Sequence, residues 1–195
     1  MTPPLIGIVG PLACGKGVVA DYLIKQYGYI SFSLSFIVHD ELKKRGVTTF
    51  TRTTLQDMGD ELRTKEGQGV LAKRAMQQLG GSVDPRSLHN QKIIIEGIRN
   101  PGEIEYLRTI PGFYLIAVDA TQELRYHRVI SRGKPWDPKD WETFSKVDGR
   151  DSGDAAHVAG QQVRACMKMA DVTIHNNDDR ENVYKEIEEL FSRTT

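Results

Sequence analysis

The chain has 195 residues, of which 39% are hydrophobic and 27% are charged, and its 26 basic side chains balance its 26 acidic ones. This length fits one domain, and the apolar fraction is sufficient for a packed core. The balanced charge argues against a dedicated nucleic-acid or membrane-binding surface, although it allows a local basic pocket.

Short β-rich runs alternate with helical patterns along the chain, which is the signature of βαβ units and a parallel sheet. The first half predicts strands at 5–9 and 29–32, helices at 16–27 and 36–45, and two helices within 55–79 that are separated at Gly67 and Gly69. The second half predicts strands at 93–95, 114–118 and 172–174, with helices at 121–131, 158–169 and 180–192. We therefore predict a three-layer α/β fold, a five-stranded parallel sheet with helices on both faces, in a single domain over 1–195.

A polar segment interrupts this alternation at about 133–155. It is rich in Asp and Pro and lacks a long apolar pattern, so we predict that it is a mobile lid inserted into the core domain. Within it, Arg150 is flanked by Asp148 and Asp151. We predict that Arg150 moves toward a bound substrate when the lid closes.

The most specific motif is the Gly-Pro-Leu-Ala-Cys-Gly-Lys-Gly run at 10–17, which matches G-x-x-x-x-G-K between a predicted strand and a predicted helix. Glycines allow backbone N–H groups to turn toward a phosphate, and the helix presents its N-terminus to the same anion. Lys16 would reach the β- and γ-phosphates of a nucleoside triphosphate. The predicted site for ATP consists of Gly10, Ala13, Cys14, Gly15, Lys16, Gly17, Val18 and Arg128.

The hydroxyl residue that usually follows the lysine of this motif is absent, because Gly17 and Val18 stand there. Either metal binding is lost and the chain is a non-catalytic module, or Mg²⁺ is held by phosphates, waters and an acidic residue elsewhere. The loop resembles that of adenylate kinase and related nucleoside monophosphate kinases, in which a glycine follows the lysine and the metal is held largely through water. Adenylate kinases then carry a threonine where this chain has Val18. We favour the active interpretation, because Mg²⁺ usually keeps several waters.

A second candidate group is the Ile-Ile-Ile-Glu-Gly-Ile-Arg-Asn-Pro run at 93–101. A carboxylate at the C-terminal end of a central strand lies where ligands bind in open α/β sheets, so Glu96 is predicted to hold a magnesium-bound water. Arg99 is predicted to bind an acceptor phosphate with a bidentate fork. The alternative is that Glu96 caps the next helix and Arg99 is a surface residue. The run resembles the Asp-Gly-x-Pro-Arg turn of adenylate kinases, although it is one residue shorter and has Glu for Asp.

Two further arginines, Arg52 and Arg63, lie in the segment at about 35–80. In the monophosphate kinases this region forms the acceptor lid, and the resemblance implies that both arginines bind the acceptor together with Arg99. For Arg63, which follows a helical stretch, the alternative is a solvated helix face.

Three arginines recur at helical spacing at positions 125, 128 and 132 and so share one helix face. Like charges at this spacing repel unless an anion or carboxylates neutralise them. We predict that Arg128 and Arg132 act with Lys16 and Arg99 as catalytic groups that stabilise the transferring phosphoryl group. The alternative is that these arginines pair with Glu123 or Asp119.

The order of elements from Leu5 to Phe191 resembles that of the nucleoside monophosphate kinase and dephospho-coenzyme A kinase group. The Ala-Asp…Ile-x-Asn run at 170–176 is similar to a run in dephospho-coenzyme A kinases, which implies a position beside the nucleoside base. A kinase-like family found mainly in archaea shares the Glu-Gly-Ile-Arg turn. It also shares an Asp-Pro-x-x-Trp-x-x-Phe segment, matched here at 137–144.

These resemblances imply an ATP- and Mg²⁺-dependent phosphotransferase whose acceptor is a nucleoside or deoxynucleoside monophosphate. One alternative is a dephospho-coenzyme A kinase, which needs a general base, and Asp40 is the nearest candidate. Another is a nucleotide-dependent regulatory ATPase or a non-catalytic nucleotide-binding module. The expected partner is a small-molecule nucleotide, with no nucleic acid and no membrane, for a monomer or homodimer.

The two cysteines, Cys14 and Cys166, lack the spacing of metal ligands, which indicates a reducing compartment and no disulfide framework. The N-terminal residues show no charged segment followed by a long apolar stretch. Every apolar run is far shorter than the ~20 residues that span a bilayer. We therefore expect a cytoplasmic protein.

Overall fold

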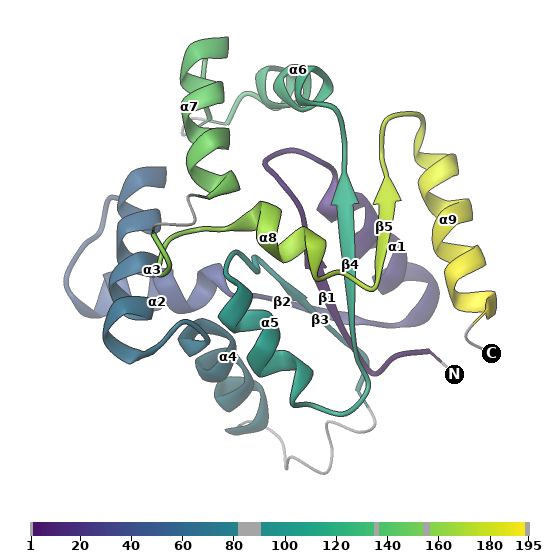
Figure 1. Cartoon of the computed structure of the whole chain (residues 1–195), viewed down its shortest axis with the longest axis horizontal. Coiled ribbons are helices and arrows are strands. Elements are labelled where there is room, and N and C mark those ends of the chain that lie inside the picture. The colour runs from purple at the N-terminus through teal and green to yellow at the C-terminus, as the bar shows by residue number, and fades with distance from the viewer. Residues whose placement is uncertain (1, 82–90, 135–136, 154–156, 194–195) are drawn as a thin grey trace.

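The computed structural model describes residues 2–81, 91–134, 137–153 and 157–193. One parallel five-stranded sheet runs through the described chain in the spatial order β2-β3-β1-β4-β5 (Figure 1). Its strands are β1 (Leu5–Val9), β2 (Ile30–Ser33), β3 (Ile93–Glu96), β4 (Phe113–Asp119) and β5 (Val172–His175). The predicted five-stranded parallel sheet is confirmed.

Helices connect these strands and cover the sheet. They are α1 (Lys16–Tyr27), α2 (Ser35–Lys44), α3 (Arg52–Glu66), α4 (Val70–Gly81), α5 (Pro101–Arg108), α6 (Gln122–Arg132), α7 (Trp141–Ser152), α8 (Val163–Lys168) and α9 (Arg180–Arg193). Among the described residues, no helix has both the length and the apolar character needed to cross a membrane.

The side chains of β1 show how the two faces of the sheet are covered. Leu5 and Val9 belong to the hydrophobic cluster formed with α2, α3, α4, α5 and α8, whereas Ile6 and Ile8 belong to the cluster formed with α1 and α9. Successive residues of a strand point to opposite faces, so a strand covered on both sides is apolar throughout. Figure 1 shows α5 and α8 crossing in front of the sheet, with α1 behind it. The predicted three-layer arrangement is therefore confirmed.

The sheet order places the carboxyl ends of β1, β3 and β4 side by side. In the register, Ile8 of β1 lies beside Glu96 of β3 and beside Ile116 of β4. The chain enters the loop at 10–15 directly after β1. In open α/β sheets, ligands bind at this edge, where neighbouring connections diverge to opposite sides.

Several helices differ from their predicted bounds for local reasons. α3 begins at Arg52 because Thr51 and Thr54 form a capping box. α8 begins only at Val163, since the carbonyl oxygens of residues 158 and 160 accept hydrogen bonds from the side chain of Asn100 (2.9 Å each) instead of continuing a helix. The described part of the 133–155 segment contains α7, whose first turn is capped by Asp140. Residues 135–136 and 154–155 of that predicted lid lie outside the described residues.

Candidate active site

The loop between β1 and α1 packs so closely against the sheet that two of its positions accept only glycine. A Cβ at Gly10 would lie 2.2 Å from the carbonyl oxygen of Val118. A Cβ at Gly15, where φ is +102°, would lie 1.8 Å from Nδ2 of Asn176. Ala13 also has a positive φ of 61°. These angles turn the loop back over the end of β1 and lead into the N-terminus of α1, a geometry suited to anions.

Lys16 places its ammonium group within this loop. Its Nζ donates to the carbonyl oxygens of Gly10 (2.7 Å) and Pro11 (2.8 Å) and lies 3.7 Å from Sγ of Cys14. Burial lowers the pKa of Lys16 below its ordinary value, as does the nearby charge of Arg99, whereas Cys14 and Asp151 oppose the shift. The loop therefore holds a partly desolvated cation at the position predicted for the phosphates.

The two residues after the lysine have different surroundings. A Cβ added to Gly17 would meet no atom within 4 Å, so there is open space beside this position. Val18 packs against the hydrophobic cluster shared by α1 and α9. The side chain of Val18 is therefore part of the core edge and offers no group to a phosphate.

Glu96 stands at the end of β3, paired in register with Ile8 and with Ser33 of β2. Its Oε1 accepts a hydrogen bond from the hydroxyl of Ser31. In the described part of the chain, no group of three or more His, Cys, Asp or Glu side chains could hold a metal ion. One strand-end carboxylate fits Mg²⁺ that keeps most of its waters and takes its other ligands from phosphates.

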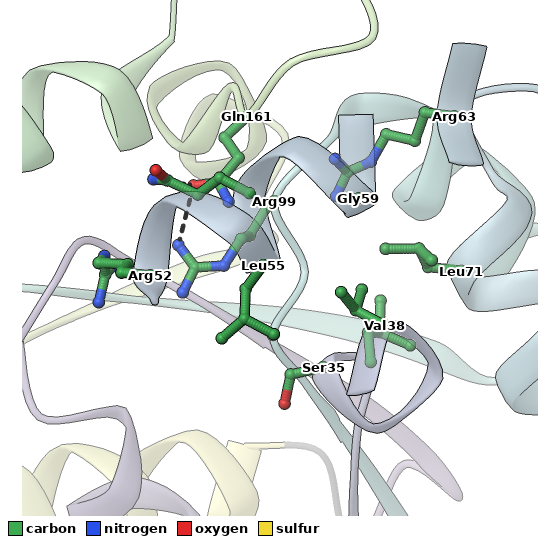
Figure 2. Close-up of a pocket in the computed structure, with 12 residues that line it drawn as sticks. Ser35, Val38, Arg52, Leu55, Gly59, Arg63, Leu71, Arg99 and Gln161 are labelled. Atoms are coloured by element: carbon green, nitrogen blue, oxygen red, sulfur yellow. Dashed lines mark hydrogen bonds between the residues drawn. The ribbon is translucent and has the colours of Figure 1, made fainter. Parts of the chain in front are cut away.

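A cavity of about 100 Å³ lies between α2, α3 and the turn after β3. Arg52, Arg63 and Arg99, the three predicted acceptor ligands, all line it. Figure 2 shows Arg52, Arg99 and Gln161 at one end and the apolar side chains of Val38 and Leu71 toward the other. The cavity therefore has two arginines at one end, and apolar side chains beside a third arginine, Arg63, at the other.

Three side chains at the cationic end, where Arg52 and Arg99 lie, are bound by Asp151 of α7, which is only 1% exposed. Its Oδ2 accepts from Nη2 of Arg52 (2.6 Å) and Nη1 of Arg99 (3.0 Å), and its Oδ1 accepts from Nε2 of Gln56 (2.7 Å). Burial by itself would raise the pKa of Asp151, but Arg99 and Arg52 outweigh it and hold that pKa below its ordinary value. Burial lowers the pKa of Arg52, so this cluster is electrostatically costly without its anion.

Arg63 forms the far wall of the cavity and is already paired. Its Nε and Nη2 donate to Oε1 of Glu103 at 3.0 and 2.9 Å, and both side chains are at most 2% exposed. Oε2 of Glu103 accepts from the backbone N–H groups of Arg99 (2.7 Å) and Asn100 (3.1 Å). The buried Arg63–Glu103 pair thus ties α3 to the turn that carries Arg99, and the alternative of a solvated helix face for Arg63 is wrong.

Two of the three arginines on α6 pair with acids from the segment predicted as a lid. Arg125 is buried and makes a bidentate pair with Asp148. Arg132 makes a bidentate pair with Asp137, with distances of 2.6 and 2.7 Å. Carboxylates therefore neutralise this face, but they come from α7 and the turn before it rather than from α6 or β4.

Arg128 contacts the phosphate loop itself. Its Nη2 donates to the carbonyl oxygen of Asn176 (2.9 Å) and its Nη1 donates to that of Cys14 (3.3 Å). Nδ2 of Asn176 donates to the same Cys14 oxygen (2.9 Å). Arg128 and Asn176 therefore clamp the loop from α6 and from the end of β5.

α7 lies between α6 and α3 (Figure 1). Its Phe144 is fully buried in a small cluster with Leu12 of the loop and Val129 of α6. Arg150 reaches across to α3, where its Nη2 lies 2.5 Å from a carboxylate oxygen of Asp57. Arg150 of α7 is therefore paired with an acid of α3 in this structure.

Sequence reasoning did not single out several residues that complete this site. Asp151, Glu103, Gln56 and Gln161 are buried polar side chains that bond to partners on other elements. The one local signal was the acidic pair around Arg150, because acids and arginines concentrated in a polar insertion often face charged partners.

Comparisons with known proteins show the family and the fold of the chain. Residues 6–148 match the family described as "AAA domain". A UPF0200 protein of Methanothrix thermoacetophila is 28% identical over 189 residues, which cover 95% of this chain and 97% of that protein. A UPF0200 protein of Pyrococcus horikoshii is 26% identical over 192 residues, covering 97% and 96%.

Solved structures show the same fold. TT1252 from Thermus thermophilus matches with a TM-score of 0.54 and 18% identity over the whole of both chains. Shikimate kinase from Aquifex aeolicus matches with a TM-score of 0.52 and 13% identity over 97% of each chain. Identities this low show the fold alone, and they confirm the predicted resemblance to P-loop kinases. The chain therefore belongs to the AAA domain family and has the fold of a P-loop kinase.

Proposed function

We propose that this protein is an ATP-dependent phosphotransferase whose acceptor is a nucleoside or deoxynucleoside monophosphate. The observation that carries the proposal is the cavity lined by Arg52, Arg63 and Arg99, whose cationic end lies within electrostatic range of Lys16. A phosphate donor held by the loop and an anionic acceptor held by the arginines would then meet at one point.

The cavity favours an acceptor that has a phosphate group on an apolar body. Arg52 and Arg99 suit a phosphate, because guanidinium groups bind its oxygens through parallel hydrogen bonds. Leu34, Leu55 and Leu71 suit the flat face of a base or a sugar. At about 100 Å³ the cavity is smaller than the about 300–1,000 Å³ of most ligand sites. Acceptor entry therefore requires α3 or α7 to shift.

The chemistry rests on positioning and charge neutralisation, with no covalent intermediate. The loop N–H groups and Lys16 would bind the β- and γ-phosphates, while Arg99 would orient the acceptor oxygen toward the γ-phosphorus. Arg132 would add positive charge to the moving phosphoryl group once it leaves its pair with Asp137, and Arg128 would fix the loop through Cys14. When bound, Mg²⁺ would neutralise phosphate charge, with Glu96 holding one of its waters.

The segment at about 133–155 would act as the lid of this site. α7 already contacts α6 through Asp148 and α3 through Arg150. Closure of such a segment excludes water, so that the γ-phosphate passes to the acceptor instead of being hydrolysed. We propose the segment at about 35–80, which carries Arg52 and Arg63, as the acceptor-binding part.

The surroundings of Asp40 do not support its role as the general base that a hydroxyl acceptor would need. Asp40 lies on α2, where its side chain is 47% exposed and pairs with Lys44 at 2.8 Å. It lines a separate surface hollow with Arg74 and Glu41. We therefore keep the dephospho-coenzyme A kinase reaction, an ATPase switch and a non-catalytic module as outcomes of the test.

The test is a coupled ADP-release assay with ATP and Mg²⁺ against nucleoside and deoxynucleoside monophosphates, dephospho-coenzyme A and no acceptor. Lys16→Ala should lower kcat by about 100- to 1,000-fold, because it removes charge stabilisation of the transition state. Lys25→Ala, on the exposed face of the same helix, is the matched control.

Acceptor-dependent release that Lys16→Ala abolishes would support the kinase. Equal release with and without acceptors would indicate an ATPase, and ATP binding without release would indicate a non-catalytic module. Arg52→Gln should raise the acceptor KM by about 10- to 100-fold, because it removes a charge-assisted hydrogen bond, while leaving the KM for ATP unchanged.

A further inference from the structure

The cationic end of the acceptor cavity is an anion site that the protein fills with its own carboxylate. Asp151 belongs to α7, whereas its three donors, Arg52, Gln56 and Arg99, belong to α3 and to the turn after β3. All three donors line the cavity. The site is therefore built without α7, and α7 supplies only the occupant.

Asp151 leaves one hydrogen-bond donor of this site without a partner. Nε of Arg52 is buried and has no hydrogen-bond partner within the described chain. Both oxygens of the Asp151 carboxylate are already engaged with the three donors. A phosphate group has a further oxygen outside the plane of a carboxylate, and buried N–H groups are normally paired. A tetrahedral anion would therefore complete the site better than Asp151 does.

The charge of the site points the same way. Arg52, Arg99 and Lys16 lie within electrostatic range of Asp151. Asp137 and its partner Arg132 also lie within electrostatic range of Arg52, so four cations meet two carboxylates and the group keeps a surplus of positive charge. A phosphate monoester dianion would balance more of it than a carboxylate can.

We propose that Asp151 is an internal substitute for the phosphate of the acceptor, which occupies the Arg52–Gln56–Arg99 site until a phosphate group displaces it. Displacement frees the C-terminal end of α7 from the Arg52–Gln56–Arg99 site and leaves only the pairs of Arg150 with α3 at that end, while Asp148 keeps its contact with Arg125 on α6. Acceptor binding is thereby coupled to the position of α7. The inference rests on the proposed function only in taking this anion to be the acceptor's phosphate, because binding of inorganic phosphate needs no catalysis.

The first test is calorimetric titration with inorganic phosphate at constant ionic strength. If Asp151 fills the site in nine of ten molecules, the apparent affinity is reduced about tenfold, since only the free fraction can bind. Asp151→Asn should therefore bind phosphate about tenfold more tightly than the wild type. Glu142→Gln removes the same charge from the exposed face of α7 and should leave the affinity unchanged.

The gain must depend on the proposed donors. Adding Arg52→Gln to Asp151→Asn should abolish the tighter binding, which separates this site from phosphate bound by the loop around Lys16. An Asp151→Asn affinity equal to or weaker than that of Glu142→Gln would overturn the proposal. A gain that survives Arg52→Gln would overturn it as well.

A second measurement uses the wild-type chain and so does not depend on whether Asp151→Asn folds. Hydrogen exchange should become faster in the C-terminal half of α7 and slower at the start of α3 when inorganic phosphate saturates the protein. Slower exchange in α7 would mean that phosphate binds beneath a helix that stays docked, which contradicts displacement. If no acceptor supports ADP release but the phosphate-binding and exchange results hold, only the kinase proposal is contradicted. If the kinase is active but those results are not obtained, only the proposed role of Asp151 is contradicted.

Discussion

Glu103 offers a sharp test of how the site is held in place. Its two carboxylate oxygens receive two hydrogen bonds from Arg63 and two from the backbone N–H groups of Arg99 and Asn100, and its side chain is fully buried. Glu103→Gln keeps the shape but removes the charge. It also turns an N–H₂ group toward donors, whichever way the amide is oriented.

The magnitude follows from the burial of the pair. Removing one partner of a buried ion pair costs about 3–5 kcal/mol, which is a large part of the about 5–15 kcal/mol that stabilises a domain. For a chain of this size, each kcal/mol lowers Tm by about 2–4 °C. We therefore expect Glu103→Gln to lower Tm by about 6–20 °C.

Differential scanning calorimetry measures this shift directly. Glu105→Gln is the matched control, because Glu105 lies on the same helix and is exposed; its Tm should stay within about 2 °C of the wild type. A Tm for Glu103→Gln equal to that of Glu105→Gln would refute the reasoning that this carboxylate neutralises Arg63. At temperatures where the variant is folded, the acceptor KM should also rise, because the turn that carries Arg99 has lost its anchor.

Two further predictions concern the loop and pH. Gly15→Ala should destabilise the protein by about 1–3 kcal/mol and abolish ATP binding, since its Cβ overlaps the amide of Asn176 and its φ is unfavourable. Gly17→Ala, whose added Cβ meets no atom, should leave the stability of the nucleotide-free protein unchanged or raise it by up to about 1 kcal/mol; equal thermal melts for the two variants would contradict this. The folded pKa of Asp151 is lowered, so its ion pairs contribute their full stability above its ordinary pKa of 3.8 and lose it as the pH falls through the folded pKa. In urea melts from pH 7 to pH 3, the difference in unfolding free energy between wild type and Asp151→Asn should shrink below about pH 4. A difference that stays constant over this range would contradict the lowered pKa of Asp151.

The sequence was informative wherever the physics is local. The strand-loop-helix at residues 5–27 follows from a short apolar run, the glycine spacing and the lysine. The break between α3 and α4 follows from Gly67, and the position of Glu96 follows from its place at the end of an apolar strand. These features depend on neighbours within a few residues, and a periodic pattern captures them.

The pairing of the arginines could not be predicted in the same way. Arg52 and Asp151 are 99 residues apart, and Arg63 and Glu103 are 40 apart. Their contacts exist only because the sheet order brings α3, α5 and α7 together. A helical pattern shows that Arg125, Arg128 and Arg132 share a face, but it does not reveal which acids meet them.

The most direct test of the phosphotransferase proposal is to follow the γ-phosphate itself. Purified protein would be incubated with Mg²⁺, γ-labelled ATP and each nucleoside monophosphate in turn, beside Lys16→Ala and Arg99→Gln. We predict that the label appears in the corresponding nucleoside diphosphate, and that both variants lose this transfer. Label that appears only as inorganic phosphate, at the same rate with and without acceptor, would contradict the proposal.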